Sequence, residues 1–167
     1  NKHLYGSDLS AAIRADLKAA GVKGVSVKCK SYSGGQNITA TVRANANCFV
    51  DKPAFVNGYK INHCGWIWTG TESIHTDKYW AADAEERERI RVAAANAKYL
   101  NYTTTEQTVN HFCVDEYTVF SPEFINKINS ILDIITAYRY DESNGMVDYF
   151  NTNFYFDIRV KPVKAER

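Results

Sequence analysis

The sequence contains no long hydrophobic run, and no stretch approaches the roughly 18 apolar residues that a membrane-spanning helix requires. It has no surplus of charge of one sign either, because 20 lysines and arginines stand against 19 acidic residues. A net charge of +1 argues against a strongly basic nucleic-acid-binding protein. Internal repeats, linkers and low-complexity segments are also absent, so the composition indicates an ordinary globular protein.

Motifs that carry familiar chemistry are missing too. No Gly-rich phosphate loop, nucleophile elbow or paired-carboxylate motif occurs, so we expect a protein that is not an enzyme and has no cofactor. The four cysteines, at positions 29, 48, 64 and 113, include no C-x-x-C pair. Because 167 residues suffice for a core without disulfides, we expect reduced thiols and a cytoplasmic location.

What the sequence does have is clear periodicity at its N-terminal end. Apolar residues recur four apart over residues 8–20, which predicts a helix capped by Ser7. Residues 24–30 and 38–44 then alternate between apolar and polar side chains on either side of a Gly-rich turn. That alternation predicts a β-hairpin directly after the helix.

Two further helices and a strand follow from the same kind of pattern. Apolar spacing predicts a helix over residues 81–100, capped by Asp83 or the small residues before it, and another that opens at Ser121-Pro122. Residues 153–161 alternate as a half-buried strand does. We therefore predict one α+β domain over residues 1–167, in which a small antiparallel sheet, the hairpin plus the C-terminal strand, packs against about three helices.

Residues 45–80 follow neither the helical nor the strand pattern of apolar side chains, and they are rich in aromatic residues. We therefore interpret them as an insertion within the domain. Asn57-Gly58 predicts a hairpin turn here, and the run "GWIWTGT" predicts a further strand. Aromatic residues dominate protein–protein interfaces, although such rings also complete cores beneath long loops. The candidate partner-binding residues are Phe55, Tyr59, Trp66, Trp68, Tyr79 and Trp80.

The helix predicted over residues 81–100 begins with an acidic stretch. The candidate partner-binding residues here are Glu85, Glu86 and Glu88, whose carboxylates would bind a basic host protein in place of nucleic-acid phosphates. The alternative is an ordinary solvated helix face. Glu85 and Arg89 also have the i,i+4 spacing of a helical ion pair.

The polar faces of the predicted strands suggest nucleic-acid binding as an alternative function. Basic side chains combined with rings that stack on bases, here Tyr32 and Tyr155, are typical of proteins that bind single strands. The competing interpretation is a solvated sheet face, or one covered by residues 45–80. The candidate residues for this alternative are Lys28, Lys30, Arg43, Tyr155, Arg159 and Lys161.

A metal- or thiol-dependent enzyme is the third possibility. His111, Cys113 and Asp115 would share one face of a strand, and His63-Cys64 is a second His/Cys pair. Together they offer zinc ligands or a Cys/His nucleophile. The spacing matches no known ligand pattern, and a buried cysteine more often behaves as a small apolar residue. We expect no metal site.

Both ends of the chain resemble one family. The run "YDESNGMVDYFNTNFYFDIRV" resembles the C-terminal signature of the large polyvalent protein-associated domain 29 family, and "AAIRADLKAAGVKGVSVKCKSYSGGQNITATV" resembles its opening. The resemblance covers residues 8–44 and 85–160 and breaks at residues 45–80. Its matching signature positions are Asp141, Asp148, Tyr149, Phe150, Asn153, Phe154 and Tyr155.

The resemblance implies a biological setting but no chemistry. Domains of this family occur in phages and conjugative elements, within long polyvalent proteins that counter host defence and as small free-standing proteins. It implies a counter-defence protein that inhibits a host CRISPR or restriction effector by direct binding. We therefore expect a host defence protein or effector complex as the partner, nucleic acid as the alternative partner, and no membrane association.

Overall fold

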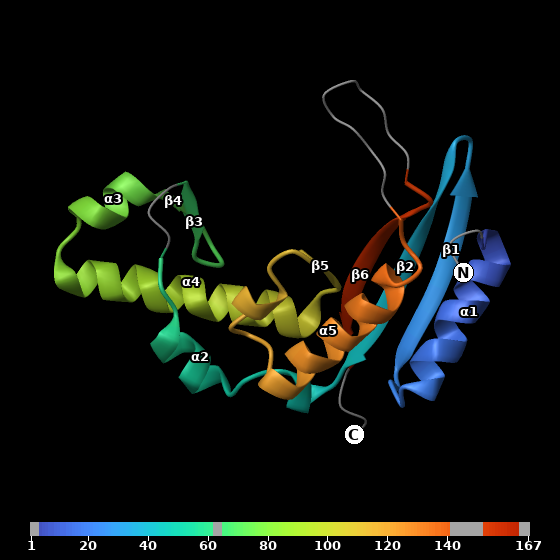
Figure 1. Ribbon diagram of the computed structural model, residues 1–167. Coiled ribbons are helices and arrows are strands. Elements are labelled where there is room, and N and C mark those ends of the chain that lie inside the picture. The colour runs from blue at the N-terminus through green and yellow to red at the C-terminus, as the bar shows by residue number, and fades with distance from the viewer. Residues whose placement is uncertain (1–3, 62–64, 141–151, 164–167) are drawn as a thin grey trace.

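A four-stranded sheet lies in one half of the protein, on the right in Figure 1. The computed structural model describes residues 4–61, 65–140 and 152–163. The strands are β1 (Val25–Tyr32), β2 (Gly35–Ala44), β5 (Gln107–Val109) and β6 (Tyr155–Pro162). Their order across the sheet is β1-β2-β6-β5, so the last strand of the chain lies inside the sheet.

The α+β class is confirmed, but the sheet is mixed instead of antiparallel. β1 and β2 form the predicted antiparallel hairpin, with Val27 opposite Ala40. β6 pairs with β2 in parallel, with Ala40 opposite Ile158, and β5 pairs with β6 in antiparallel fashion. A parallel neighbour requires a long crossover connection, and the helices between β2 and β6 supply it.

Five α-helices and two short 3₁₀ turns accompany this sheet within the described residues. The helices are α1 (Gly6–Ala19), α2 (Lys52–Gly58), α3 (Thr76–Ala81), α4 (Ala84–Thr104) and α5 (Pro122–Thr136). The 3₁₀ turns are η1 (Ala46–Cys48) and η2 (Val114–Glu116), and a second, two-stranded sheet consists of β3 (Trp66–Trp68) and β4 (Ser73–His75). No helix in the described ranges is long and apolar enough to cross a bilayer.

The main core lies on one face of the four-stranded sheet, under α1 and α5 (Figure 1). The predicted apolar stripe of α1 is confirmed, because Leu9, Ile13 and Leu17 are all buried there. Alternate residues of β2 and β6, such as Ile38 and Ile158, are fully buried against the helices. The residues between them point to the opposite face, where the burial pattern leaves them exposed or half-buried.

Two of the three predicted helix caps are confirmed. The Asp83 carboxylate accepts a hydrogen bond from the Glu86 amide at 2.8 Å, and the Ser121 hydroxyl accepts one from the Phe124 amide at 3.3 Å. The prediction for Ser7 is wrong, because α1 begins one residue earlier and Ser7 lies inside its first turn. The Gly6 amide instead donates to the side chain of Gln36 on β2, so a tertiary contact sets where the helix begins.

Residues 45–80 form short elements that pack on α4. The hairpin predicted at Asn57-Gly58 is wrong, because α2 occupies these residues; Pro53 in its first turn favours a helix there. The strand predicted in "GWIWTGT" is confirmed as β3, which pairs with β4. Together with α3 and α4 these elements enclose a second, smaller hydrophobic cluster of Ile67, Tyr79, Ile90 and Ala94.

Candidate functional site

A basic hollow lies on the face of the sheet opposite α1 and α5. The strand register brings Lys28 opposite Thr39, Thr41 opposite Arg159, and Arg43 opposite Lys161. The hollow has a volume of about 720 Å³. We call it the basic sheet face, and its lining residues are Gly24, Val25, Ser26, Lys28, Lys30, Thr39, Thr41, Arg43, Glu106, Arg159 and Lys161. Five of the six residues of the predicted nucleic-acid set are therefore brought together.

The charge on the basic sheet face is strongly unbalanced. Within the described residues its only carboxylate contact is a pair 3.6 Å apart between Arg159 Nη1 and Glu106 Oε1, and both of those side chains are more than a third exposed. Asp157, on the same face, accepts a hydrogen bond from the Asn37 amide at 3.1 Å. Five cations against these two acids leave three positive charges in excess. Solvated cations arranged in this way attract polyanions.

Two exposed tyrosine rings lie at one end of the basic sheet face. Tyr32 is 46% exposed and Tyr155 is 52% exposed. Tyr32 is paired with Gly35, and a Cβ atom on Gly35 would lie only 3.0 Å from its ring, so the ring lies against the glycine backbone. Tyr155 is paired with Asn37, two residues further along β2. These rings offer apolar faces beside the cations, as a stacking surface requires.

The β3–β4 hairpin carries a second exposed feature. Trp66 and Trp68 are 71% and 56% exposed, whereas Ile67 between them is buried. The Trp66 ring packs edge-on against His75, with centroids 5.2 Å apart. We call these two residues the tryptophan hairpin. A hollow of about 500 Å³ separates it from α4. Trp80, on α3, is 41% exposed.

Three of the six predicted aromatic contact residues are not surface rings. Phe55 and Tyr79 are only 4% and 7% exposed, because they belong to the main core and the smaller cluster respectively. Tyr59 is half-buried against the main core. A buried ring cannot contact a partner, so Phe55 and Tyr79 complete cores instead. The alternative interpretation that Trp66 and Trp68 complete a core is wrong, because both rings are exposed.

The acidic start of α4 is largely neutralised by arginines of the same helix. Glu86 accepts two hydrogen bonds from Arg89, at 2.6 and 2.7 Å, and Glu88 accepts two from Arg91, at 2.7 and 2.8 Å. These hydrogen bonds lower the pKa of both carboxyl groups. The predicted pair of Arg89 with Glu85 is wrong, because Arg89 makes its bidentate contact three residues away instead of four. Glu85 remains exposed.

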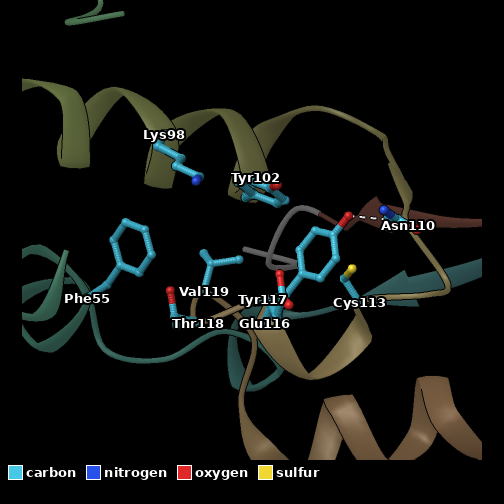
Figure 2. A pocket seen from close by; sticks show the side chains of 9 residues that line it. All are labelled: Phe55, Lys98, Tyr102, Asn110, Cys113, Glu116, Tyr117, Thr118 and Val119. Atoms are coloured by element: carbon cyan, nitrogen blue, oxygen red, sulfur yellow. Dashed lines mark hydrogen bonds between the residues drawn. The ribbon is translucent and has the colours of Figure 1, made fainter. Parts of the chain in front are cut away.

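Figure 2 shows a third feature, a cleft of about 260 Å³ bounded by α4, α2 and the segment around η2. Lys98 points from α4 into the space between Phe55 and Tyr102 (Figure 2). The cleft is lined by Phe55, Lys98, Tyr102, Asn110, Cys113, Glu116, Tyr117, Thr118 and Val119. We call it the Lys98 cleft. Sequence reasoning missed Lys98, although its position four residues from both Ala94 and Tyr102 places it on the inward stripe of α4.

The described residues include no group of three or more His, Cys, Asp and Glu side chains placed to hold a metal ion. His111, Cys113 and Asp115 do not share a strand face, because β5 ends at Val109 and the irregular stretch that follows contains η2. The His111 ring packs on Phe156, and burial there lowers its pKa. Burial also raises the pKa of the Cys29 and Cys48 thiols, which keeps them in the unreactive form. His63 and Cys64 lie outside the described residues.

The family-signature residues that are described have structural roles, except for the exposed Tyr155. The Asn153 side-chain amide donates to the Tyr138 carbonyl at 2.7 Å, and its oxygen accepts from the Tyr140 amide at 3.0 Å. Phe154 is a fully buried core residue. Asp141, Asp148, Tyr149 and Phe150 lie outside the described residues.

Comparison with protein-family models, curated proteins and solved structures finds no match to this chain. The resemblance of its two ends to the polyvalent protein-associated family stays a prediction.

Proposed function

We propose that this protein binds nucleic acid through the basic sheet face. The observation that carries the proposal is the gathering of five cations on one open face of the sheet, with three positive charges in excess. Near-neutral net charge does not oppose it, because the phosphate backbone responds to the local arrangement of cations. The proposal favours the alternative from the sequence over direct protein binding, whose residue set is partly buried or ion-paired.

The dimensions of the face suit a short single strand. From Asn37 to Arg43, β2 spans seven residues, and the six steps between them cover about 20 Å along the sheet. A four-stranded sheet of this kind accommodates two or three bases stacked on exposed rings. Tyr32 and Tyr155 occupy one end and Arg43 with Lys161 the other, so bases and phosphates each have a place to contact.

The first test measures binding of fluorescein-labelled single-stranded DNA and RNA oligonucleotides at several salt concentrations. We expect affinity to fall with salt, and the double variant Lys28→Gln/Arg43→Gln to reduce the magnitude of the slope of log K against log salt by about 1.4, since each phosphate contact with a single strand contributes about 0.7. Lys18→Gln is the matched control, because Lys18 is an exposed lysine on α1, across the sheet. Binding that resists salt, or that falls equally with Lys18→Gln, contradicts the proposal.

The second test separates stacking from charge. Tyr155→Leu should weaken binding of single strands by roughly tenfold, since base stacking contributes about 1–3 kcal/mol per base. Gly35→Ala should act in the same direction, because the new Cβ atom, 3.0 Å from the Tyr32 ring, displaces it. An abasic oligonucleotide should bind both variants and the unaltered protein equally. If both variants bind normal oligonucleotides with unchanged affinity, Tyr32 and Tyr155 do not stack on bases.

A second candidate function is inhibition of a host defence effector through the tryptophan hairpin. The observation that favours it is the exposure of Trp66 and Trp68, at 71% and 56%, beside a hollow on α4. Large exposed rings next to a groove are typical anchors of protein interfaces. In this proposal the protein is a phage or mobile-element counter-defence protein that blocks a CRISPR or restriction complex by occupancy.

The plating efficiency of a phage on hosts that carry an active CRISPR or restriction system tests this second function. Expression of the protein should raise plating, and Trp66→Ala/Trp68→Ala should abolish the rise. Phe112→Ala is the matched control, because Phe112 is 83% exposed and lies elsewhere on the surface. Full protection by the folded double variant excludes the tryptophan hairpin from that role.

A further inference from the structure

The Lys98 cleft is separate from the basic sheet face and adjoins the hollow beside the tryptophan hairpin, because Lys98 lines both the cleft and that hollow. It shares no lining residue with the hollow of the basic sheet face. α4 contributes Lys98 and Tyr102, the end of β5 leads into Asn110, and the segment around η2 contributes Tyr117. These elements come together only in the folded protein, so the cleft is a product of tertiary structure.

Lys98 brings a cation into this cleft without a counter-ion. None of the ion pairs among the described residues includes Lys98. The contact it does make is with the ring of Tyr59, whose centroid lies 5.4 Å from Nζ. Lys98 as a whole is an exposed residue, but partial burial of its ammonium group lowers its pKa, and no neighbouring carboxylate offsets that shift. An ammonium group in this position is stabilised when an anion binds beside it.

Two aromatic rings form one part of the cleft wall. Tyr102 and Tyr117 pack edge to face with centroids 6.0 Å apart, while Phe55 and Val119, which also line the cleft, are almost fully buried. Burial raises the pKa of Tyr102, which therefore presents a neutral phenol at pH 7. The Tyr117 hydroxyl already accepts a hydrogen bond from the Asn110 amide at 2.7 Å. Such walls suit a flat ring.

The charge and size of the cleft restrict the ligand further. Lys98 supplies one positive charge, whereas the Glu116 carboxylate at the exposed edge opposes anions, and a polyanion such as a nucleotide phosphate most strongly. At about 260 Å³ the cleft is smaller than the usual pocket for a drug-sized ligand, about 300–1,000 Å³. We propose that the Lys98 cleft binds a small aromatic carboxylate, with its carboxylate on Lys98 Nζ, away from Glu116, and its ring against Tyr102 and Tyr117.

Titration of the full chain with phenylacetate, followed by amide NMR signals, tests this proposal. Signals of residues near 98, 102 and 117–119 should shift together, and phenylacetamide, the neutral match, should bind at least about tenfold more weakly. Lys98→Met should weaken phenylacetate binding by a similar factor. Lys18→Met, an exposed lysine of α1, should leave it unchanged.

A free aromatic acid and a peptide that ends in an aromatic residue both offer a carboxylate beside a ring. A short peptide ending in phenylalanine is therefore titrated in a second, parallel experiment. Binding of phenylacetate assigns the cleft to free acids, and binding of the peptide alone assigns it to chain ends. Equal binding of phenylacetate and phenylacetamide by the unaltered protein overturns the proposal. So does a shift pattern confined to the basic sheet face, and neither result depends on whether the Lys98→Met variant folds.

Discussion

A hydrogen bond between Tyr138 and Asp16 joins the residues that follow α5 to α1. The two oxygen atoms lie 2.5 Å apart, and the Tyr138 side chain is buried although Asp16 is exposed. The bond raises the pKa of Tyr138 to about 12, because the phenol donates to a carboxylate and is stabilised in its protonated form. It is a long-range contact that no local pattern of the sequence indicates.

Tyr138→Phe should lower the free energy of unfolding by about 1 kcal/mol, as removal of one hydrogen bond usually does. The contribution is fully present below the usual tyrosine pKa of about 10 and is lost as the pH rises toward about 12, since the native state then holds a proton that the unfolded chain releases. Urea denaturation at pH 7 measures the loss. Tyr155→Phe, at an exposed ring, should show none.

Gln36 is a second residue whose role the sequence does not reveal. It is only 1% exposed, and its amide group contacts the Gly6 amide, the Cys29 thiol and the carbonyls of Leu4 and Asn153. On β2 it lies between residues that point to the basic sheet face, so its own side chain points to the core. Alternation predicts its burial, but only the meeting of three chain segments shows which groups it satisfies.

At the level of elements, the helix caps distinguish local from tertiary control. Ser121 and Ser7 are both serines at predicted helix starts, yet only Ser121 accepts a hydrogen bond from its helix. Ser121→Ala should therefore destabilise the protein by about 1 kcal/mol, and Ser7→Ala should change its stability little. Thermal or urea unfolding of both variants measures the difference. Equal losses would show that capping is not what Ser121 contributes.

The long elements were predictable, whereas most of the short ones, β3 excepted, were not. α1, α4 and α5 have apolar stripes and the β1–β2 hairpin has clean alternation, so each pattern repeats often enough to be recognised. α2, α3 and β4 have at most seven residues each, too few for a period to appear. Their conformation depends on packing against α4, which explains why Asn57-Gly58 was mistaken for a turn.

At the level of the whole molecule, α4 connects two hydrophobic clusters. Ala95 is buried in the main core, whereas Ile90 and Ala94 belong to the smaller cluster with the β3–β4 hairpin and α3. In Figure 1 this smaller cluster lies at the end of α4 far from β1 and α1. Few apolar residues hold it together, so local opening should cost less there than in the sheet.

Hydrogen exchange on two matched variants tests this division. Ile90→Ala should remove amide protection in β3, β4 and α3 while leaving that of β2 and β6 unchanged. Ile158→Ala, at a fully buried position of β6, should lower the global free energy of unfolding by about 2–5 kcal/mol and reduce protection throughout. A uniform loss of protection in Ile90→Ala would mean that both clusters unfold as one unit.

The candidate sites follow the same division. The cations of the basic sheet face were predictable, because strand alternation decides which side chains share a face and needs no knowledge of the partner strand. The contribution of Glu106 was not, since this residue precedes β5 and reaches Arg159 only through the pairing of β5 with β6. The exposure of Trp66 and the burial of Phe55 were equally beyond the sequence, because both residues are aromatic and neither lies in a long periodic segment.

Local patterns in the amino-acid order were enough to predict the class of fold, the long helices, the hairpin and the face on which each strand residue lies. These depend on periods of two or 3.6 residues and on caps, which act within a few positions of the chain. The tertiary structure alone decided that β6 lies parallel to β2, that Gln36 and Tyr138 find distant partners, and that Lys98 enters a cleft. The physical reason is that each of these depends on groups far apart in sequence, whose meeting is fixed by packing of the whole core.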